Sequence, residues 1–225
     1  MPPADVAALQ KSSAAKGGTR AAASRNRIVD AALELFSTHG YEGTSIRDIA
    51  TAVGMTTASL YYHFSSKDEL FVIVHGLSID AVTTAVEGAI AGIADPWDQL
   101  EAAADAHCTT LFETDGTRAI LTARISGGLA GVNGALVAQR DSYERLIQRL
   151  VDDLVLPAEL DRKLLRLHIL GVLNSLPNWF HRGGPLTAGE IGRQMIRHLR
   201  LGLEDNKPRK TRALAADCGR TSNER

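Results

Sequence analysis

Apolar residues recur every three or four positions along most of the chain, and no segment alternates apolar and polar residues in a sustained way. The first pattern marks one face of an α-helix, whereas a half-buried strand alternates with a period of two. We therefore predict an all-α fold. The helical pattern is clearest over residues 46–53, 57–63, 67–93, 97–111, 136–154, 161–180 and 187–203.

Two short helices joined by a tight turn are predicted in the first third of the chain. The first has one apolar face, and Thr44 or Ser45 can cap its start. Gly54 follows its last apolar residue, where a helix end favours a positive φ, and Thr56 or Thr57 can then cap the second helix. Two helices joined in this way make a helix-turn-helix, a unit that can place its second helix in the major groove of DNA.

The second of these helices has a polar face suited to DNA. Leu60 and Phe64 anchor the helix inward, while its other side chains are small or can form hydrogen bonds with base edges and phosphates. A helix-turn-helix can also be a simple packing corner, with its tyrosines and histidine half-buried in a core. The agreement of turn glycine, caps and exposed polar residues favours DNA binding.

The same residues resemble the signature of TetR-family transcriptional regulators. The resemblance rests on Leu60–Phe64 with Lys67, on Arg47–Ala50 and Gly54, and on Arg27–Phe36 with Gly40 and Tyr41. It implies that the tyrosine and lysine positions hold phosphates and that the start of the second helix reaches bases. The predicted DNA-contacting residues are Arg47, Thr57, Ala58, Ser59, Tyr61, Tyr62, His63 and Lys67.

Residues 25–70 are thus predicted to form the DNA-binding domain, and residues 71–205 a larger helical domain for effector binding and dimerisation. A capping box at Ser66–Glu69 begins a helix of about 27 residues, roughly 40 Å long, that can connect the two. The last two helices carry more apolar surface than one face needs. We expect them to form a four-helix bundle with a second copy, and the alternative is that they close the monomer core. One helix-turn-helix contacts one half-site, so a homodimer on a palindromic double-stranded DNA operator is expected.

An effector pocket is predicted near the end of the penultimate helix. Pro177 should kink that helix near Trp179, and the segment Trp179–Thr187 resembles TetR-family regulators of fatty-acid and steroid breakdown, several of which respond to acyl-CoA thioesters. The resemblance implies an apolar effector with an anionic handle. Candidate wall residues are His107, Cys108, Phe112, Leu129, Asn174 and Trp179, and candidate charges are Arg118, Arg124, His181 and Arg182. Each is also compatible with an ordinary core or surface role.

The ends of the chain are basic although its formal net charge is −1. Residues 1–27 carry five basic side chains against one acidic, and residues 207–225 carry six against two. We predict a flexible arm over residues 1–24 and a flexible tail over residues 206–225. The arm can contact DNA or merely improve solubility, and the tail is expected to be solvated.

Other functional classes find little support in the sequence. No histidine pair has metal-ligand spacing, and neither a nucleophile elbow nor a phosphate-binding loop occurs, so we expect neither an enzyme nor a cofactor. Two distant cysteines suit a reducing cytoplasm, and we expect no secretory leader and no apolar run able to span a membrane. The remaining alternative is a helical carrier or adaptor that binds lipid-like molecules without DNA.

Overall fold

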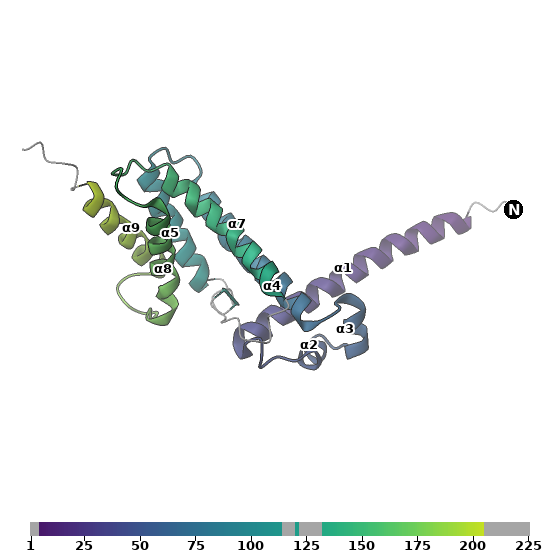
Figure 1. Cartoon of the computed structure of the whole chain (residues 1–225). Helices are drawn as coiled ribbons and strands as arrows, with labels where there is room; N and C mark the ends of the chain where they lie inside the picture. The colour runs from purple at the N-terminus through teal and green to yellow at the C-terminus, as the bar shows by residue number, and fades with distance from the viewer. Residues whose placement is uncertain (1–4, 114–119, 122–131, 205–225) are drawn as a thin grey trace, which may run out of the picture.

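The computed structural model describes residues 5–113, 120–121 and 132–204, and every regular element in these ranges is a helix. This confirms the all-α prediction. The helices form a small N-terminal unit and a larger body, and α4 runs through both (Figure 1). In chain order the elements are α1 (Asp5–His39), α2 (Ile46–Ala52), α3 (Thr57–His63), α4 (Lys67–Ile90), α5 (Pro96–Glu113), α7 (Asn133–Asp152), α8 (Arg162–Ser175), the 3-10 helix η2 (Leu176–Asn178) and α9 (Ala188–Glu204).

The N-terminal unit is built around three aromatic rings. Phe71 at the start of α4 packs edge-to-face against Phe36 of α1, at 5.3 Å between centroids, and against Tyr41, at 5.1 Å. All three side chains are buried. Edge-to-face pairs add about 0.5–1.5 kcal/mol to the free energy gained by burial, so this cluster fixes α1 against the start of α4.

The turns of the N-terminal unit follow the predicted chemistry. Ser45 caps α2 in a capping box with Asp48, which accepts a hydrogen bond from the Ser45 backbone N–H at 2.8 Å. Thr56 caps α3 by accepting from the Ser59 backbone N–H at 3.1 Å. Gly54 between the two helices has a φ of +68°, a conformation that costs glycine little. Of the alternatives that the sequence leaves open, Ser45 and Thr56 are therefore the caps.

The start of α4 differs slightly from the predicted capping box. Ser66 does cap the helix, because its hydroxyl accepts a hydrogen bond from the Glu69 backbone N–H at 3.0 Å. The Glu69 carboxylate, however, accepts from the backbone N–H of Ser65, at 2.7 Å, rather than from that of Ser66. The reciprocal bond is displaced by one residue.

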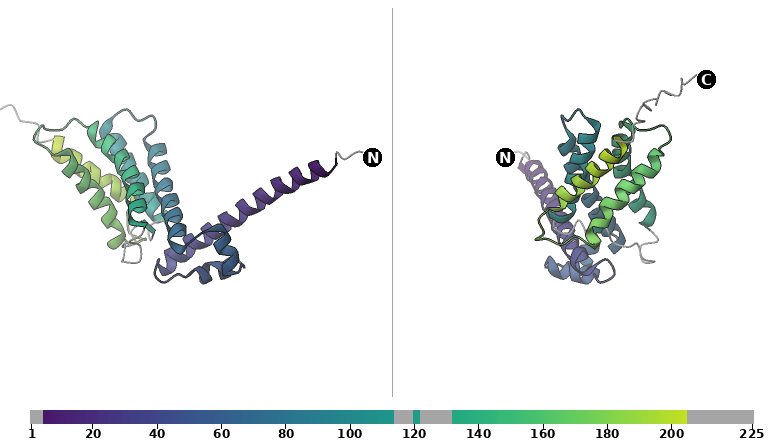
Figure 2. Two further views of the ribbon diagram at one scale, coloured as in Figure 1. Left: turned by 45° about the vertical axis from the view of Figure 1, so that its right-hand side comes forward. Right: turned by 90° about the vertical axis from the view of Figure 1, so that its left-hand side faces the viewer.

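α4 is the central helix of the molecule and packs against α1, α5 and α7 (Figure 2). By length and composition alone it is apolar enough to cross a membrane, contrary to the expectation that no segment would be. Its apolar side chains are explained by packing, because residues such as Val74, Val82 and Val86 are fully buried between neighbouring helices.

The first helix is longer than the sequence suggests. We predict a flexible arm over residues 1–24, whereas α1 begins at Asp5 and its first half extends away from the rest of the molecule (Figures 1 and 2). The physical reason is composition: alanine has the highest helix propensity, and this segment is rich in alanine and continuous with a helix held by a core. The predicted tail, 206–225, lies outside the described residues.

The end of α8 also differs from the prediction. The sequence predicts a helix that continues to Phe180 with a kink at Pro177, but α8 ends at Ser175 and the chain passes into η2. Proline has no N–H, and its ring clashes with the carbonyl four residues earlier, so a helix end is the alternative to a kink.

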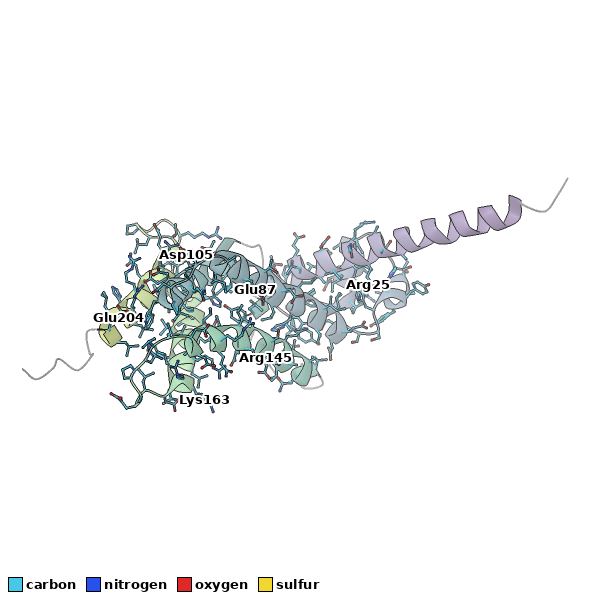
Figure 3. All side chains as sticks on the ribbon, turned by 90° about the horizontal axis from the view of Figure 1, so that it is seen from above. Arg25, Glu87, Asp105, Arg145, Lys163 and Glu204 are labelled. Carbon is cyan, nitrogen blue, oxygen red and sulfur yellow. The ribbon has the colours of Figure 1, made fainter. Side chains whose placement is uncertain are left out.

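In the body, α9 packs closely on α5 because Gly189 and Gly192 have no side chains where the two helices meet. A Cβ atom at Gly192 would lie 2.6 Å from the Ala104 carbonyl oxygen and 2.7 Å from the Cys108 Sγ. Ion pairs also join the same two helices, including Arg197–Glu101 at 2.9 Å, in which the Glu101 side chain is buried. Figure 3, from above, labels Asp105 on α5 and Glu204 at the end of α9.

We predict that Gly192→Ala destabilises the protein by about 1–3 kcal/mol, because the added methyl group must displace the α5 backbone. Gly88→Ala is the matched control, since Gly88 lies in α4 and a Cβ there meets nothing within 4 Å. The control should be neutral or stabilising by up to about 1 kcal/mol. Urea unfolding measures both, and equal stability of the two variants would contradict the close packing.

Candidate DNA interface and ligand pocket

α3 presents the predicted polar face to solvent. Thr57, Ala58 and Ser59 at its start are exposed, and the Tyr62 side chain is 86% exposed. Leu60, on the opposite face, is fully buried. Folding does not require a tyrosine at so exposed a position, which leaves both its ring and its hydroxyl free to contact another molecule.

The remaining predicted contacts surround this face. Arg47 on α2 and Tyr61 on α3 are accessible to solvent, while His63 is half-buried beside the Tyr62 ring, at 5.4 Å between centroids. The structure therefore brings most of the predicted set together on α2 and α3. Lys67 is the exception.

Lys67 bonds within the protein. Its ammonium donates hydrogen bonds to the backbone carbonyls of Tyr41, at 2.9 Å, and Thr44, at 3.1 Å, and lies 3.9 Å from the centre of the Tyr41 ring. Tyr41 in turn donates to the Asp68 carboxylate, and burial raises the pKa of this phenol, so it stays protonated. Lys67 thus ties the start of α4 to the segment before α2, with one N–H left for other partners.

Two arginines of α1 hold the helix-turn-helix in place, a role that the sequence reasoning missed. Arg27 donates to the Val53 carbonyl at the end of α2, at 2.9 Å, and the Arg25 guanidinium lies 4.9 Å from the Phe64 ring centre after α3. Arg25 is labelled in Figure 3. The first contact satisfies a helix-end carbonyl and the second is a cation–π interaction. In the sequence Arg25 stands out only as a basic charge, and Arg27 only as the first residue of a segment that resembles the TetR signature.

The body contains an open cavity of about 750 Å³ lined mainly by α4, α5, α7 and α8. Its volume is in the range typical of small-molecule sites. Two of the predicted wall residues, His107 and Asn174, line it. The full lining is Ile79, Val82, His107, Leu111, Leu121, Arg140, Tyr143, Glu144, Leu167, Leu170, Gly171, Asn174 and Asn178.

The other predicted wall residues lie elsewhere. Cys108 is buried at the α5–α9 contact, where desolvation raises its thiol pKa to about 12. Phe112 packs edge-to-face on Phe180, at 4.8 Å between centroids. Trp179 is half-exposed and donates to the Ser175 hydroxyl at 3.3 Å. Of the predicted charges, Arg182 donates to the Phe112 carbonyl, His181 is exposed, and Arg118 and Arg124 lie, like Leu129, outside the described residues.

A buried pair of polar groups marks the inside of the cavity. His107 is 3% exposed, and its Nδ1 lies 2.7 Å from the Tyr143 hydroxyl. Desolvation lowers the His107 pKa to about 4, opposed only in part by Asn174, so the imidazole is neutral at pH 7. Its Nε2 has no hydrogen-bond partner of ordinary geometry among the described residues. Buried polar groups are rarely left unpaired. The Asn174 side chain, which raises the His107 pKa, lines the same cavity.

Charged residues line the more exposed part of the same cavity. Glu144 forms an ion pair with Arg166 of α8 at 2.5 Å. Arg140, one turn earlier on α7, is partly exposed and forms no ion pair within the part of the chain that the structure describes. The sequence does not predict Tyr143 or Arg140 as wall residues, because α7 shows only an ordinary amphipathic pattern.

The Gln139 side chain joins the cavity wall to the N-terminal half of α4 by two hydrogen bonds. Gln139, next to Arg140, donates to the Val72 carbonyl at 3.1 Å, and its side-chain oxygen lies 2.7 Å from the His75 Nδ1. His75 is buried, and desolvation lowers its pKa. Leu136, one turn before Gln139, belongs to the core of the N-terminal unit. α7 therefore contacts both the cavity and the DNA-binding end.

The described residues contain no group of three or more histidine, cysteine, aspartate or glutamate side chains placed to hold a metal ion.

Two family models match the two structural units. Residues 28–73 match bacterial regulatory proteins of the tetR family, and residues 94–203 match the tetracyclin repressor-like C-terminal domain. The chain belongs to the TetR family of bacterial transcriptional regulators. This confirms the resemblance inferred from residues 25–70.

Three proteins are similar to about three quarters of this chain. The HTH-type transcriptional repressor KstR2 of Mycobacterium tuberculosis is 24% identical over 181 residues, 76% of this chain and 88% of its own. PfmR of Thermus thermophilus, a TetR-family regulator, has a TM-score of 0.65 at 29% identity, over 77% of this chain and 93% of its own. AibR, solved in complex with isovaleryl coenzyme A and operator DNA, has a TM-score of 0.65 at 24% identity, over 78% of this chain and 97% of its own.

We predict that Lys67→Met lowers the stability of the protein, whereas Tyr62→Phe weakens DNA binding and leaves stability unchanged. Lys67→Met removes two charge-assisted hydrogen bonds and should lower the free energy of unfolding by about 1–3 kcal/mol without DNA present. Tyr62→Phe removes an exposed hydroxyl and should leave stability within about 0.5 kcal/mol while weakening DNA binding. Thermal unfolding and fluorescence anisotropy with DNA measure the two effects. A Lys67→Met protein as stable as the wild type would show that the internal bonds contribute nothing.

Proposed function

We propose that this regulator is a repressor that binds its operator as a homodimer and releases it when a small molecule occupies the cavity. The observation that supports this most directly is the placement of the cavity. Two of its wall-forming helices, α4 and α7, also pack in the core of the DNA-binding unit. A ligand that changes the position of either helix must change the position of α3 as well.

In the proposed complex, α3 enters the major groove. Thr57, Ala58 and Ser59 at its start contact base edges, and Tyr61 and Tyr62 bind phosphates. Arg47 and His63 add contacts at the edge of the same surface. Since phosphate contacts displace counterions, the affinity should fall steeply as salt rises.

The proposed dimer uses α8 and α9. Leu164 on α8 is 64% exposed, and Leu201 on α9 is 54% exposed. A groove of about 300 Å³ between the two helices is lined by His168, Ile169, Val172, Leu173, Met195, Ile196, His198 and Leu199. The same helices of a second copy would cover these apolar groups in a four-helix bundle and place two α3 helices for a palindromic operator.

We propose an apolar effector with a polar or anionic handle, such as an acyl-CoA thioester. Six aliphatic side chains line the cavity: Ile79, Val82, Leu111, Leu121, Leu167 and Leu170. Arg140 can bind an anion near the opening. AibR, which shares this fold, was solved with isovaleryl coenzyme A, which supports the choice of thioesters as the first compounds to test.

The first test is fluorescence anisotropy with DNA from the protein's own promoter region, across a salt series, with and without a panel of acyl-CoA thioesters. We expect saturable binding that weakens with salt and is reversed by at least one thioester. Specific binding that no thioester reverses would retain the regulator and reject this effector class. No binding beyond nonspecific levels would favour a helical carrier.

A second test addresses the contact between α7 and α4. Gln139→Ala removes the hydrogen bonds to Val72 and His75, so we expect operator and ligand each to bind while the ligand releases DNA less effectively. The coupling should fall by part of the about 1–3 kcal/mol typical of allosteric proteins. Gln148→Ala is the matched control, on the exposed side of the same helix. Equal release by both variants would exclude a role for Gln139.

A further inference from the structure

The cavity holds a hydrogen-bonding group whose protonation follows from its surroundings. Tyr143 is buried, and burial raises the pKa of its phenol, so it keeps its proton. The His107 Nδ1, at 2.7 Å, is the partner that the structure gives this hydroxyl. If Nδ1 carried the proton instead, the phenol hydrogen would be buried without an acceptor, which costs about 1–3 kcal/mol. The Tyr143 hydroxyl therefore donates to His107 Nδ1.

The hydrogen bond from Tyr143 to Nδ1 makes the other ring nitrogen of His107, Nε2, a hydrogen-bond donor. A neutral imidazole carries one proton, so when Nδ1 accepts from Tyr143, Nε2 carries the N–H. That N–H is buried, has no partner of ordinary geometry among the described residues and belongs to a side chain that lines the cavity. Asn174, whose side chain raises the His107 pKa and lines the same cavity, lies outside ordinary hydrogen-bond geometry for this atom, so the N–H can donate to a ligand.

The surroundings favour an uncharged acceptor. Uncharged groups line the cavity around His107: Val82 and Leu111 are buried in its wall, and the Asn174 amide interacts with the imidazole. A carboxylate held there would lose its hydration and gain a hydrogen bond from only one neutral donor, so its burial would be unfavourable. Arg140 and the Glu144–Arg166 pair lie at the more exposed part of the cavity, so charged groups of a ligand belong there.

We infer that His107 and Tyr143 form a carbonyl-binding site within the effector pocket: the effector is an apolar ketone, ester or thioester whose uncharged carbonyl oxygen accepts from the His107 Nε2–H, with any anionic group outside, at Arg140. This inference rests on the proposed function and makes it more specific. It separates carbonyl compounds from free fatty acids of the same length.

Titration calorimetry with three ligands that share one alkyl chain tests this inference. The ligands are octanoyl-CoA, 2-nonanone and octanoate. We expect 2-nonanone to bind more tightly than octanoate, and octanoyl-CoA more tightly than either. His107→Leu should weaken both carbonyl ligands at least ~10-fold, equivalent to about 1.4 kcal/mol. Arg140→Gln should weaken octanoyl-CoA by a similar factor and leave 2-nonanone unchanged.

His107→Gln restores an N–H donor and should recover part of the lost affinity, which a merely structural role of the histidine would not explain. Thermal unfolding establishes that each variant is folded. Equal affinity of wild type and His107→Leu for 2-nonanone would overturn the site, as would tighter binding of octanoate than of 2-nonanone. If none of the three ligands binds while the wild-type protein still binds its operator, the carbonyl site fails and the regulator stands. If the wild-type protein does not bind its operator either, the proposed function itself is rejected.

Discussion

The packing of α4 in two cores is the constraint on which the rest of the structure depends. Phe71 and Val74 belong to the core of the DNA-binding unit, and Val82 and Val86, two to four turns later, belong to the core of the body. All four are nearly inaccessible to solvent. Because protein interiors are densely packed, α4 cannot move in one core without displacing side chains in the other. The two units are therefore mechanically joined.

α7 adds a second connection of a different kind. Leu136 packs in the N-terminal core, Gln139 bonds to α4, and Tyr143 lines the cavity, so three successive turns of one helix link the cavity and the DNA-binding unit. A ligand changes DNA affinity only if it binds the two arrangements of the protein differently. In the proposed mechanism a ligand can do so because α4 and α7 line the cavity and also pack in the core of the DNA-binding unit.

The sequence predicts best what local interactions decide. Caps at Ser45 and Thr56 and the turn at Gly54 depend only on neighbouring residues. The cavity is predicted poorly, because its wall combines helices far apart in the chain; the sequence indicates His107 and Asn174 but not Tyr143 or Arg140. Lys67 resembles a phosphate ligand in the sequence, since nothing local shows that its ammonium reaches the carbonyls of Tyr41 and Thr44. The helix before Ser24 is not predicted, because the polar residues of this segment suggest a flexible arm, whereas its alanine content favours a helix.

The measurement that tests the central claim most directly is the distance between the two DNA-binding units of the dimer. Spin labels at Asp30→Cys, an exposed site on α1, report it by double electron–electron resonance; Cys108 is buried, and Cys218→Ser removes the other thiol. If cavity and DNA-binding unit are joined through α4 and α7, a ligand that releases operator DNA must shift the distribution of this distance. An unchanged distribution, at ligand concentrations that release the DNA, would contradict the account.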